Sequence, residues 1–154
     1  MDSSGGNYLR ILQVTYFGIL AGILLSAIVA VYLTYSNLLA VRMDDARDLF
    51  RIVLVVAGLG GVIGSITMFK KRMTAIRANT DLKTKLAAYR AALVIKLFMI
   101  EGPTMLGIIL FLLTRDYLIL SITGLIIVFF IMNRPSKYSV MNDLELTGDE
   151  WAGY

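Results

Sequence analysis

Long apolar runs dominate this sequence, and they constrain its fold more than any other feature. Four such runs occur, at residues 11–35, 52–69, 91–114 and 117–132. A helix needs about 20 apolar residues to cross the hydrocarbon core of a bilayer, and backbone in lipid must satisfy its own hydrogen bonds. The runs show no strand-like alternation of apolar and polar residues. The sequence therefore predicts an all-α polytopic membrane protein with four transmembrane helices arranged as two antiparallel hairpins.

The residue types that are missing narrow the possible chemistry. Apolar residues make up 58% of the chain, and neither cysteine nor histidine occurs in its 154 residues. Without them there is no disulfide, no thiol nucleophile and no imidazole, which is the commonest general base and transition-metal ligand. We therefore expect no enzyme activity, no cofactor and no metal site.

Basic residues are concentrated in one connection, between residues 70 and 96. Eight lysines and arginines lie there against one acid, Asp81. Three further basic residues flank the outer ends of the first and fourth runs, whereas the two opposite loops hold four. Because cytoplasmic loops carry the excess of Lys and Arg, both termini are predicted to be cytoplasmic, in a multi-pass protein of the plasma (bacterial inner) membrane.

The same connection predicts a basic helical hairpin over residues 70–96, which projects from the membrane. Its break falls at residues 77–81, where Thr80 or Asp81 can cap the next helix. The hairpin is an orientation signal, and its first bases are also candidates for binding anionic lipid. These are Lys70, Lys71, Arg72 and Arg77. Membrane lipids are thus expected partners, and nucleic acid is not.

Small residues recur at helical spacing in the first two runs. In lipid, small residues four positions apart let a second helix approach closely. The predicted packing positions are Gly18, Gly22 and Ser26 in the first run and Gly60, Gly61 and Gly64 in the second. The first stripe serves either packing within the bundle or self-association. Because the second run is glycine-rich on two faces, we expect residues 52–69 to lie centrally.

An acid, a glycine and a proline interrupt the third run at Glu101, Gly102 and Pro103. A carboxylate at the membrane centre costs about 3 kcal/mol on insertion scales, so such a residue is a functional hypothesis by default. Proline lacks an N–H, which frees the carbonyl of Met99 and predicts a helix kink at Gly102 and Pro103. Among helical neighbours of Glu101, Thr104 is the polar one. Glu101 and Thr104 are therefore the candidate ion-binding pair.

Three roles for Glu101 remain open at this point. In the first, it is a structural tether that bonds Ser65, Thr67 or Thr123 on a neighbouring helix. In the second, it exchanges a proton or an ion. In the third, it contacts lipid or a partner protein. Nothing in the sequence decides which role applies.

The end of the chain differs in character from the rest. Residues 1–135 form the predicted transmembrane domain, and residues 136–154 form an acidic cytoplasmic tail. Apolar residues recur in this tail at amphipathic spacing, at Val140, Met141, Leu144, Leu146 and Trp151. We expect a short amphipathic segment that rests on the membrane or on a partner.

The region 57–113 resembles the helical hairpin of the c-type proteolipid subunits of rotary ATPases. The shared features are a glycine-rich helix (Gly58, Gly60, Gly61, Gly64), a polar loop, and a second helix with a mid-membrane acid followed by proline. The resemblance implies that Glu101 carries a proton or sodium ion. The loop lacks the Arg/Gln-Pro signature of that family, and the proline follows two positions after the acid. The whole chain also resembles small uncharacterised four-span membrane proteins of Bacteroidota type, a likeness that implies the topology alone.

Two functions are consistent with these observations. The first is a non-catalytic accessory or assembly subunit of a larger membrane complex, with other membrane subunits or further copies of itself as partners. The alternative is a proteolipid, similar to the c-type subunits, that binds protons or sodium through Glu101.

Overall fold

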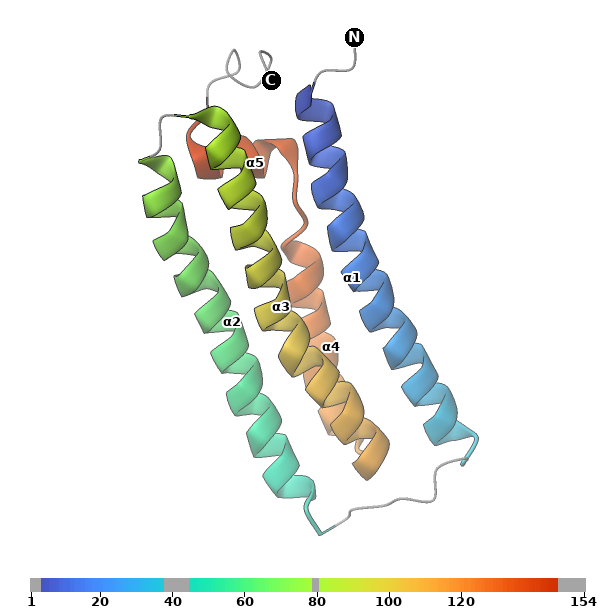
Figure 1. Cartoon of the computed structure of the whole chain (residues 1–154). Helices are drawn as coiled ribbons and strands as arrows, with labels where there is room; N and C mark the ends of the chain where they lie inside the picture. The colour runs from blue at the N-terminus through green and yellow to red at the C-terminus, as the bar shows by residue number, and fades with distance from the viewer. Residues whose placement is uncertain (1–3, 38–44, 79–80, 147–154) are drawn as a thin grey trace.

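The chain folds into a bundle of antiparallel helices, seen in a computed structural model (Figure 1). The structure describes residues 4–37, 45–78 and 81–146. The helices are α1 (Ser4–Tyr35), α2 (Arg47–Arg77), α3 (Leu82–Thr114), α4 (Tyr117–Met132) and α5 (Lys137–Leu144). No strand occurs within these described ranges. The predicted all-α fold is confirmed.

Three helices, α1, α2 and α3, are each long and apolar enough to cross a membrane. Helix α4 has only 16 residues, and it is followed by a bend of 76° into α5. The structure therefore has three spanning candidates, or four if α4 and α5 are counted as one bent span. Both α2 and α3 extend beyond their apolar runs, so the basic residues within 70–77 and 82–90 lie on helical extensions.

Helix α3 is the centre of the bundle, because it packs against α1, α2 and α4 (Figure 1). Its buried residues lie on several faces and include Leu93, Ile100, Gly107 and Phe111. The expectation that residues 52–69 are central is wrong. Helix α2 exposes a long apolar side that includes Val56, Leu59 and Ile63, and a bilayer would cover it.

The contact between α2 and α3 depends on glycine. A Cβ atom added at Gly61 would lie 2.6 Å from the carbonyl oxygen of Met99 and 2.7 Å from Cγ of Pro103. At Gly64 it would lie 2.9 Å from Cε of Met99, whereas at Gly60 it would meet no neighbouring atom within 4 Å. Of the two adjacent glycines, α2 therefore turns Gly61 toward α3 and leaves Gly60 on the outer side.

The turn between α3 and α4 is tied to the start of α2. Asp116 caps α4 by accepting from the backbone N–H of Leu118 at 2.9 Å, and its other oxygen accepts from Nε of Arg51 at 2.6 Å. The hydrogen bond from Arg51 lowers the pKa of the Asp116 carboxyl below its ordinary value. Arg51 also pairs with Asp48 at 2.7 Å on the exposed surface. One arginine thus holds three helix ends together.

Helix α5 folds back onto the opposite end of its own bundle. Its residues Val140 and Leu144 are buried, and Arg77 at the end of α2 pairs with Glu145 at 2.6 Å. The same guanidinium donates to the backbone carbonyl of Asp143 at 2.7 Å. The described part of the tail, residues 136–146, therefore packs on the ends of α2 and α3. Trp151 lies outside the described residues.

The glycine contact gives a stability prediction. Gly61→Ala should destabilise the bundle by roughly 1–3 kcal/mol, because the new methyl group collides with backbone at Met99 and with the Pro103 ring. Gly60→Ala is the matched control, and it should leave stability unchanged or slightly higher. Unfolding in detergent, followed by circular dichroism, measures both variants. Equal unfolding midpoints for the two would contradict this packing.

The Asp116–Arg51 pair predicts a pH dependence. Asp116→Asn keeps a capping residue and removes the charge, so it should lower the thermal midpoint at pH 7 by about 2–5 °C. A carboxyl whose pKa is lowered by folding stabilises the folded state at pH values above its unfolded pKa of about 3.9. This stabilisation is lost as the pH falls through the folded pKa. The difference between wild type and variant should therefore shrink as the pH falls below about 4.

The control for this experiment is Asp48→Asn, whose side chain is 89% exposed although it contacts the same arginine. An exposed pair contributes little, so this variant should unfold like wild type. A midpoint difference for Asp116→Asn that stays constant from pH 7 to pH 3 would argue against the ion pair as its cause.

Candidate functional site

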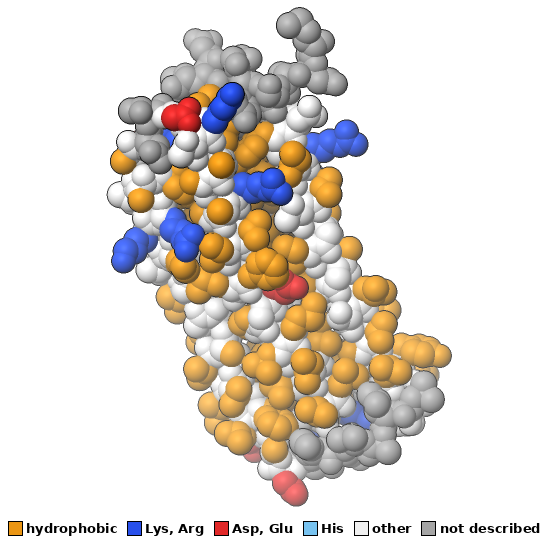
Figure 2. Space-filling view, in the orientation of Figure 1, with side chains coloured by type: hydrophobic (Ala, Val, Ile, Leu, Met, Phe, Trp, Pro, Cys, Tyr) orange, Lys and Arg blue, Asp and Glu red, His pale blue; other side chains and the backbone are white. Residues whose placement is uncertain are grey.

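The candidate site centres on Glu101, in the middle of α3. Figure 2 shows an acidic side chain at mid-height of the bundle among hydrophobic ones, and Glu101 is the one acidic residue within the described part of the predicted spans. The side chain is half-buried. Its Oε2 atom is buried and has no hydrogen-bond partner among the described residues. A buried polar atom without a partner is costly, so this oxygen is free to accept a donor from outside the chain.

Thr104 does not form a hydrogen-bonded pair with Glu101. Its side chain is fully buried, and its hydroxyl donates to the carbonyl of Ile100 in its own helix at 2.8 Å. The hydroxyl proton is therefore already used. Thr104 retains an acceptor lone pair. Glu101 and Thr104 can therefore each offer an oxygen acceptor to a cation.

The predicted tethers are absent between the described residues. The hydroxyls of Ser65, Thr67 and Thr123 donate to carbonyls of their own helices, at Val62, Ile63 and Ile119 respectively. A hydroxyl in a helix can bond the preceding turn in this way without help from a neighbour. Glu101 is consequently not held by any of the three side chains that the sequence offered.

The residues next to Glu101 leave its outer side open. Phe98, one turn before, is 57% exposed. Gly102 is exposed, and a Cβ atom there would meet no neighbouring atom within 4 Å. Pro103 lies inside one continuous helix, Leu82–Thr114. The predicted kink residues therefore have different surroundings, because Pro103 faces α2 and Gly102 borders open space.

The small-residue stripe of α1 does not pack against the rest of the described chain at its two glycines. A Cβ atom at Gly18 or at Gly22 would meet no neighbouring atom within 4 Å. Ser26 is half-buried. Helix α1 instead uses larger residues for its buried side, among them Leu12, Tyr16, Ile23 and Ala30.

Tyr16 has a structural role that its position in the sequence did not reveal. It lies near the start of the first apolar run, where tyrosine usually marks the membrane interface. In the structure it is fully buried and its ring stacks on Phe130 at 5.3 Å. Its hydroxyl donates to the carbonyls of Phe130 and Ile131 at 3.2 and 3.1 Å. It thus satisfies acceptors at the C-terminal end of α4.

A second polar cluster lies where α5 covers α2 and α3. Tyr89 donates to Oδ2 of Asp143 at 3.0 Å, and Ser139 lies 3.4 Å from the same atom. Burial raises the pKa of the Tyr89 hydroxyl. Lys96 places its Nζ 4.7 Å from the centre of the Phe69 ring. The bond from Tyr89 to Asp143 holds α5 against α3, and the Lys96–Phe69 contact joins α3 to α2. No sequence pattern indicated that Asp143 would reach Tyr89.

The predicted anionic-lipid bases divide into two groups. Arg77 is engaged with Glu145 and with the carbonyl of Asp143. Lys70 and Lys71 are exposed, and Arg72 is half-buried. Groups of three or more Asp or Glu side chains that could hold a metal ion do not occur within residues 4–37, 45–78 and 81–146.

Comparison of the chain with protein families, with curated proteins and with solved structures gives no match. The resemblance to the c-type proteolipid hairpin thus rests on the short motifs of the sequence, and the geometry of Glu101 carries the functional argument.

Proposed function

We propose that this protein is a small integral membrane subunit with four transmembrane helices in two antiparallel hairpins, and that it serves as a non-catalytic accessory or assembly component of a larger membrane complex. In this proposal Glu101 accepts a hydrogen bond or an ion pair from a transmembrane helix of a partner chain. The observation that carries it is the buried Oε2 atom, which has no donor within the described chain.

The distribution of charge supports a bacterial inner-membrane topology with both termini in the cytoplasm. Helices α1 and α3 run in one direction and α2 and α4 in the other, so the basic hairpin and the N-terminus share one end (Figure 1). In Figure 2 the Lys and Arg side chains gather over that end and the middle of the molecule is hydrophobic. An excess of basic residues at one end is the usual cytoplasmic signal.

The surroundings of Glu101 support a partner helix as the source of the donor. Inside a bilayer, ionisable residues pair with one another or with backbone groups, because water is absent. The open space beside Gly102 would let a second helix come close. The bare faces of Gly18 and Gly22 on α1 give a further place where a helix from another chain can pack.

A second candidate is the proton- or sodium-binding proteolipid, and one observation favours it. The glycine face of α2 packs directly against the Met99–Pro103 segment of α3, which is the close packing that the resemblance implies for these glycines. In this alternative Glu101 carries the ion, and Thr104 contributes an acceptor.

Association through Glu101 predicts a loss of partners on substitution. Wild type, extracted from its own membranes in mild detergent with an N-terminal tag, should show a native mass dominated by other chains. Glu101→Ala should lose most of those chains, because an unpaired buried donor would remain on the partner. Ile109→Ala, an exposed position on the same helix, is the control and should keep them.

The opposite outcome is a ladder of masses that contains only copies of this chain and ends at one multiple of 17.1 kDa. That result would reject the accessory role and favour a ring of identical proteolipids.

The ion-carrier alternative predicts a chemical modification. A hydrophobic carbodiimide should label Glu101 covalently, the rate should change with pH, and sodium should slow it if sodium is the carried ion. Labelled peptides are identified by mass spectrometry, with Glu101→Gln as the unlabelled control. An absence of labelling, or a rate indifferent to both pH and sodium, would exclude ion exchange at this carboxyl.

A further inference from the structure

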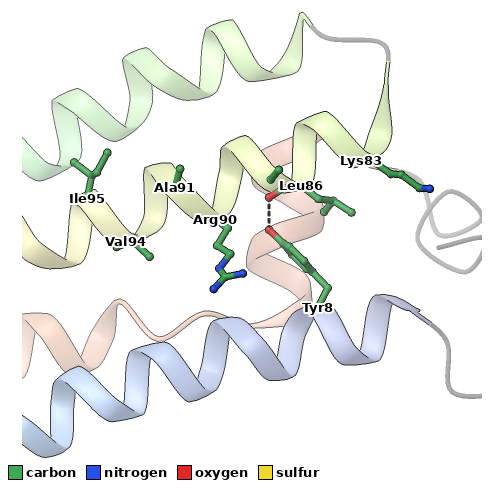
Figure 3. Close-up of a pocket in the computed structure, with 8 residues that line it drawn as sticks. Tyr8, Lys83, Leu86, Arg90, Ala91, Val94 and Ile95 are labelled. Atoms are coloured by element: carbon green, nitrogen blue, oxygen red, sulfur yellow. Dashed lines mark hydrogen bonds between the residues drawn. The ribbon is translucent and has the colours of Figure 1, made fainter.

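A cavity of about 610 Å³ lies between α1 and the first turns of α3, and Glu101 is not among its lining residues (Figure 3). Tyr8 forms its α1 side, and its hydroxyl donates to the backbone carbonyl of Leu86 at 2.7 Å. This bond fixes the beginning of α1 against α3. The space beside it is a groove with Tyr8 on one side and residues of α3 on the other.

The α3 side of the groove is basic at one end and apolar at the other. Lys83 and Arg90 line the end near the basic hairpin, and Val94 and Ile95 line the end toward the membrane. Figure 3 shows Arg90 pointing from α3 into the space beside α1, with Lys83 extending at the outer mouth. Two alanines, Ala87 and Ala91, line the groove between its basic and apolar ends, and their small side chains leave it open.

The two bases have little opposing charge on this surface. No ion pair in the described part of the chain involves Lys83 or Arg90, and both side chains are exposed. The acid next to them in sequence is Asp81, whose carboxylate caps α3 by accepting from the backbone N–H and the hydroxyl of Thr84 at 3.1 and 2.5 Å. The positive charge is thus available to an external anion.

We propose that this groove binds one anionic glycerophospholipid from the cytoplasmic leaflet. Arg90 binds the phosphate, Lys83 adds a second positive charge at the mouth, and an acyl chain lies along Val94 and Ile95. Guanidinium matches the geometry of phosphate oxygens through two parallel hydrogen bonds. Basic pockets between transmembrane helices on the cytoplasmic side are suited to anionic headgroups. A free phosphate would satisfy the bases but would leave the apolar half uncovered, which is why a lipid is the better occupant.

The test measures lipid binding to the full-length protein in detergent by native mass spectrometry. Phosphatidylglycerol is titrated against phosphatidylcholine with the same acyl chains. Wild type should bind one phosphatidylglycerol roughly 25-fold more tightly than phosphatidylcholine. Lys83→Gln together with Arg90→Gln should remove this preference, because each base near the surface contributes about fivefold.

Matched controls separate a built groove from general attraction. Arg10→Gln together with Lys85→Gln removes the same charge from the same end of the bundle, at positions that do not line the groove, and should change phosphatidylglycerol affinity less than twofold. Ala91→Phe keeps both bases and fills the groove, so it should weaken lipid binding several-fold. Circular dichroism checks that each variant keeps its helices, and Lys83→Gln alone, at an exposed position, serves if the double variant does not fold.

Two results would overturn the proposal. An equal loss of affinity in the Arg10/Lys85 and Lys83/Arg90 variants would show diffuse electrostatic attraction. Displacement of phosphatidylglycerol by glycerol 3-phosphate at similar concentrations, together with full binding by Ala91→Phe, would show a phosphate site that needs no acyl chain. Neither result depends on Glu101, so the lipid site and the proposed subunit function stand or fall separately.

Discussion

The bundle depends on the contact between a carbonyl that proline leaves free and a glycine on the neighbouring helix. Pro103 has no N–H, so the carbonyl of Met99 lacks its helical partner at a depth where water cannot replace it. Gly61 brings its backbone against this oxygen, which only a residue without a side chain can do. Cα–H groups near a carbonyl are weakly favourable, and the approach excludes lipid from it. This contact sets the register of α2 on α3. At a second level, Gly107 of α3 touches both Thr123 of α4 and Leu54 of α2, so glycines locate all three helices.

Much of this architecture could be predicted from the sequence, because apolar runs of this length have few alternatives in a bilayer. The depth of one helix relative to another could not. Tyr16 illustrates the reason: it looks like an interfacial residue, yet α4 ends at Met132, before the longer helices beside it, and the carbonyls of its last turn need donors. The Tyr16 hydroxyl lies at their level and provides one. Similarly, two adjacent glycines on α2 both have helix-packing spacing, and the sequence does not say whether Gly60 or Gly61 meets α3.

The candidate site shows the same division. Its location could be predicted, since an acid next to a proline in a 24-residue apolar run is conspicuous, but its bonding could not. Hydroxyls at Ser65, Thr67 and Thr123 were reasonable tethers by composition, and each instead bonds its own helix. The position of the tail has an electrostatic cause. Its acids lie opposite the basic end of α2, where Arg77 pairs with the carboxylate of Glu145 and donates a hydrogen bond to the backbone carbonyl of Asp143. The amphipathic pattern indicated a buried apolar face, and the bundle itself buries two residues of that face, Val140 and Leu144.

The two proposed contacts, with a lipid phosphate and with a partner helix, are related by the geometry of α3. Arg90 and Glu101 are eleven residues apart on one continuous helix, which corresponds to about 16 Å along its axis. Half the hydrocarbon thickness of a bilayer is about 15 Å. The phosphate lies in the headgroup layer, outside the hydrocarbon core. A nearly upright helix that holds a phosphate at Arg90 therefore carries its carboxyl on the cytoplasmic side of the bilayer midplane, and closer to the cytoplasmic leaflet if it tilts. Because α3 packs against three other helices, the whole bundle follows its depth. A lipid bound at the cytoplasmic end would thus fix the level at which Glu101 is presented to a donor.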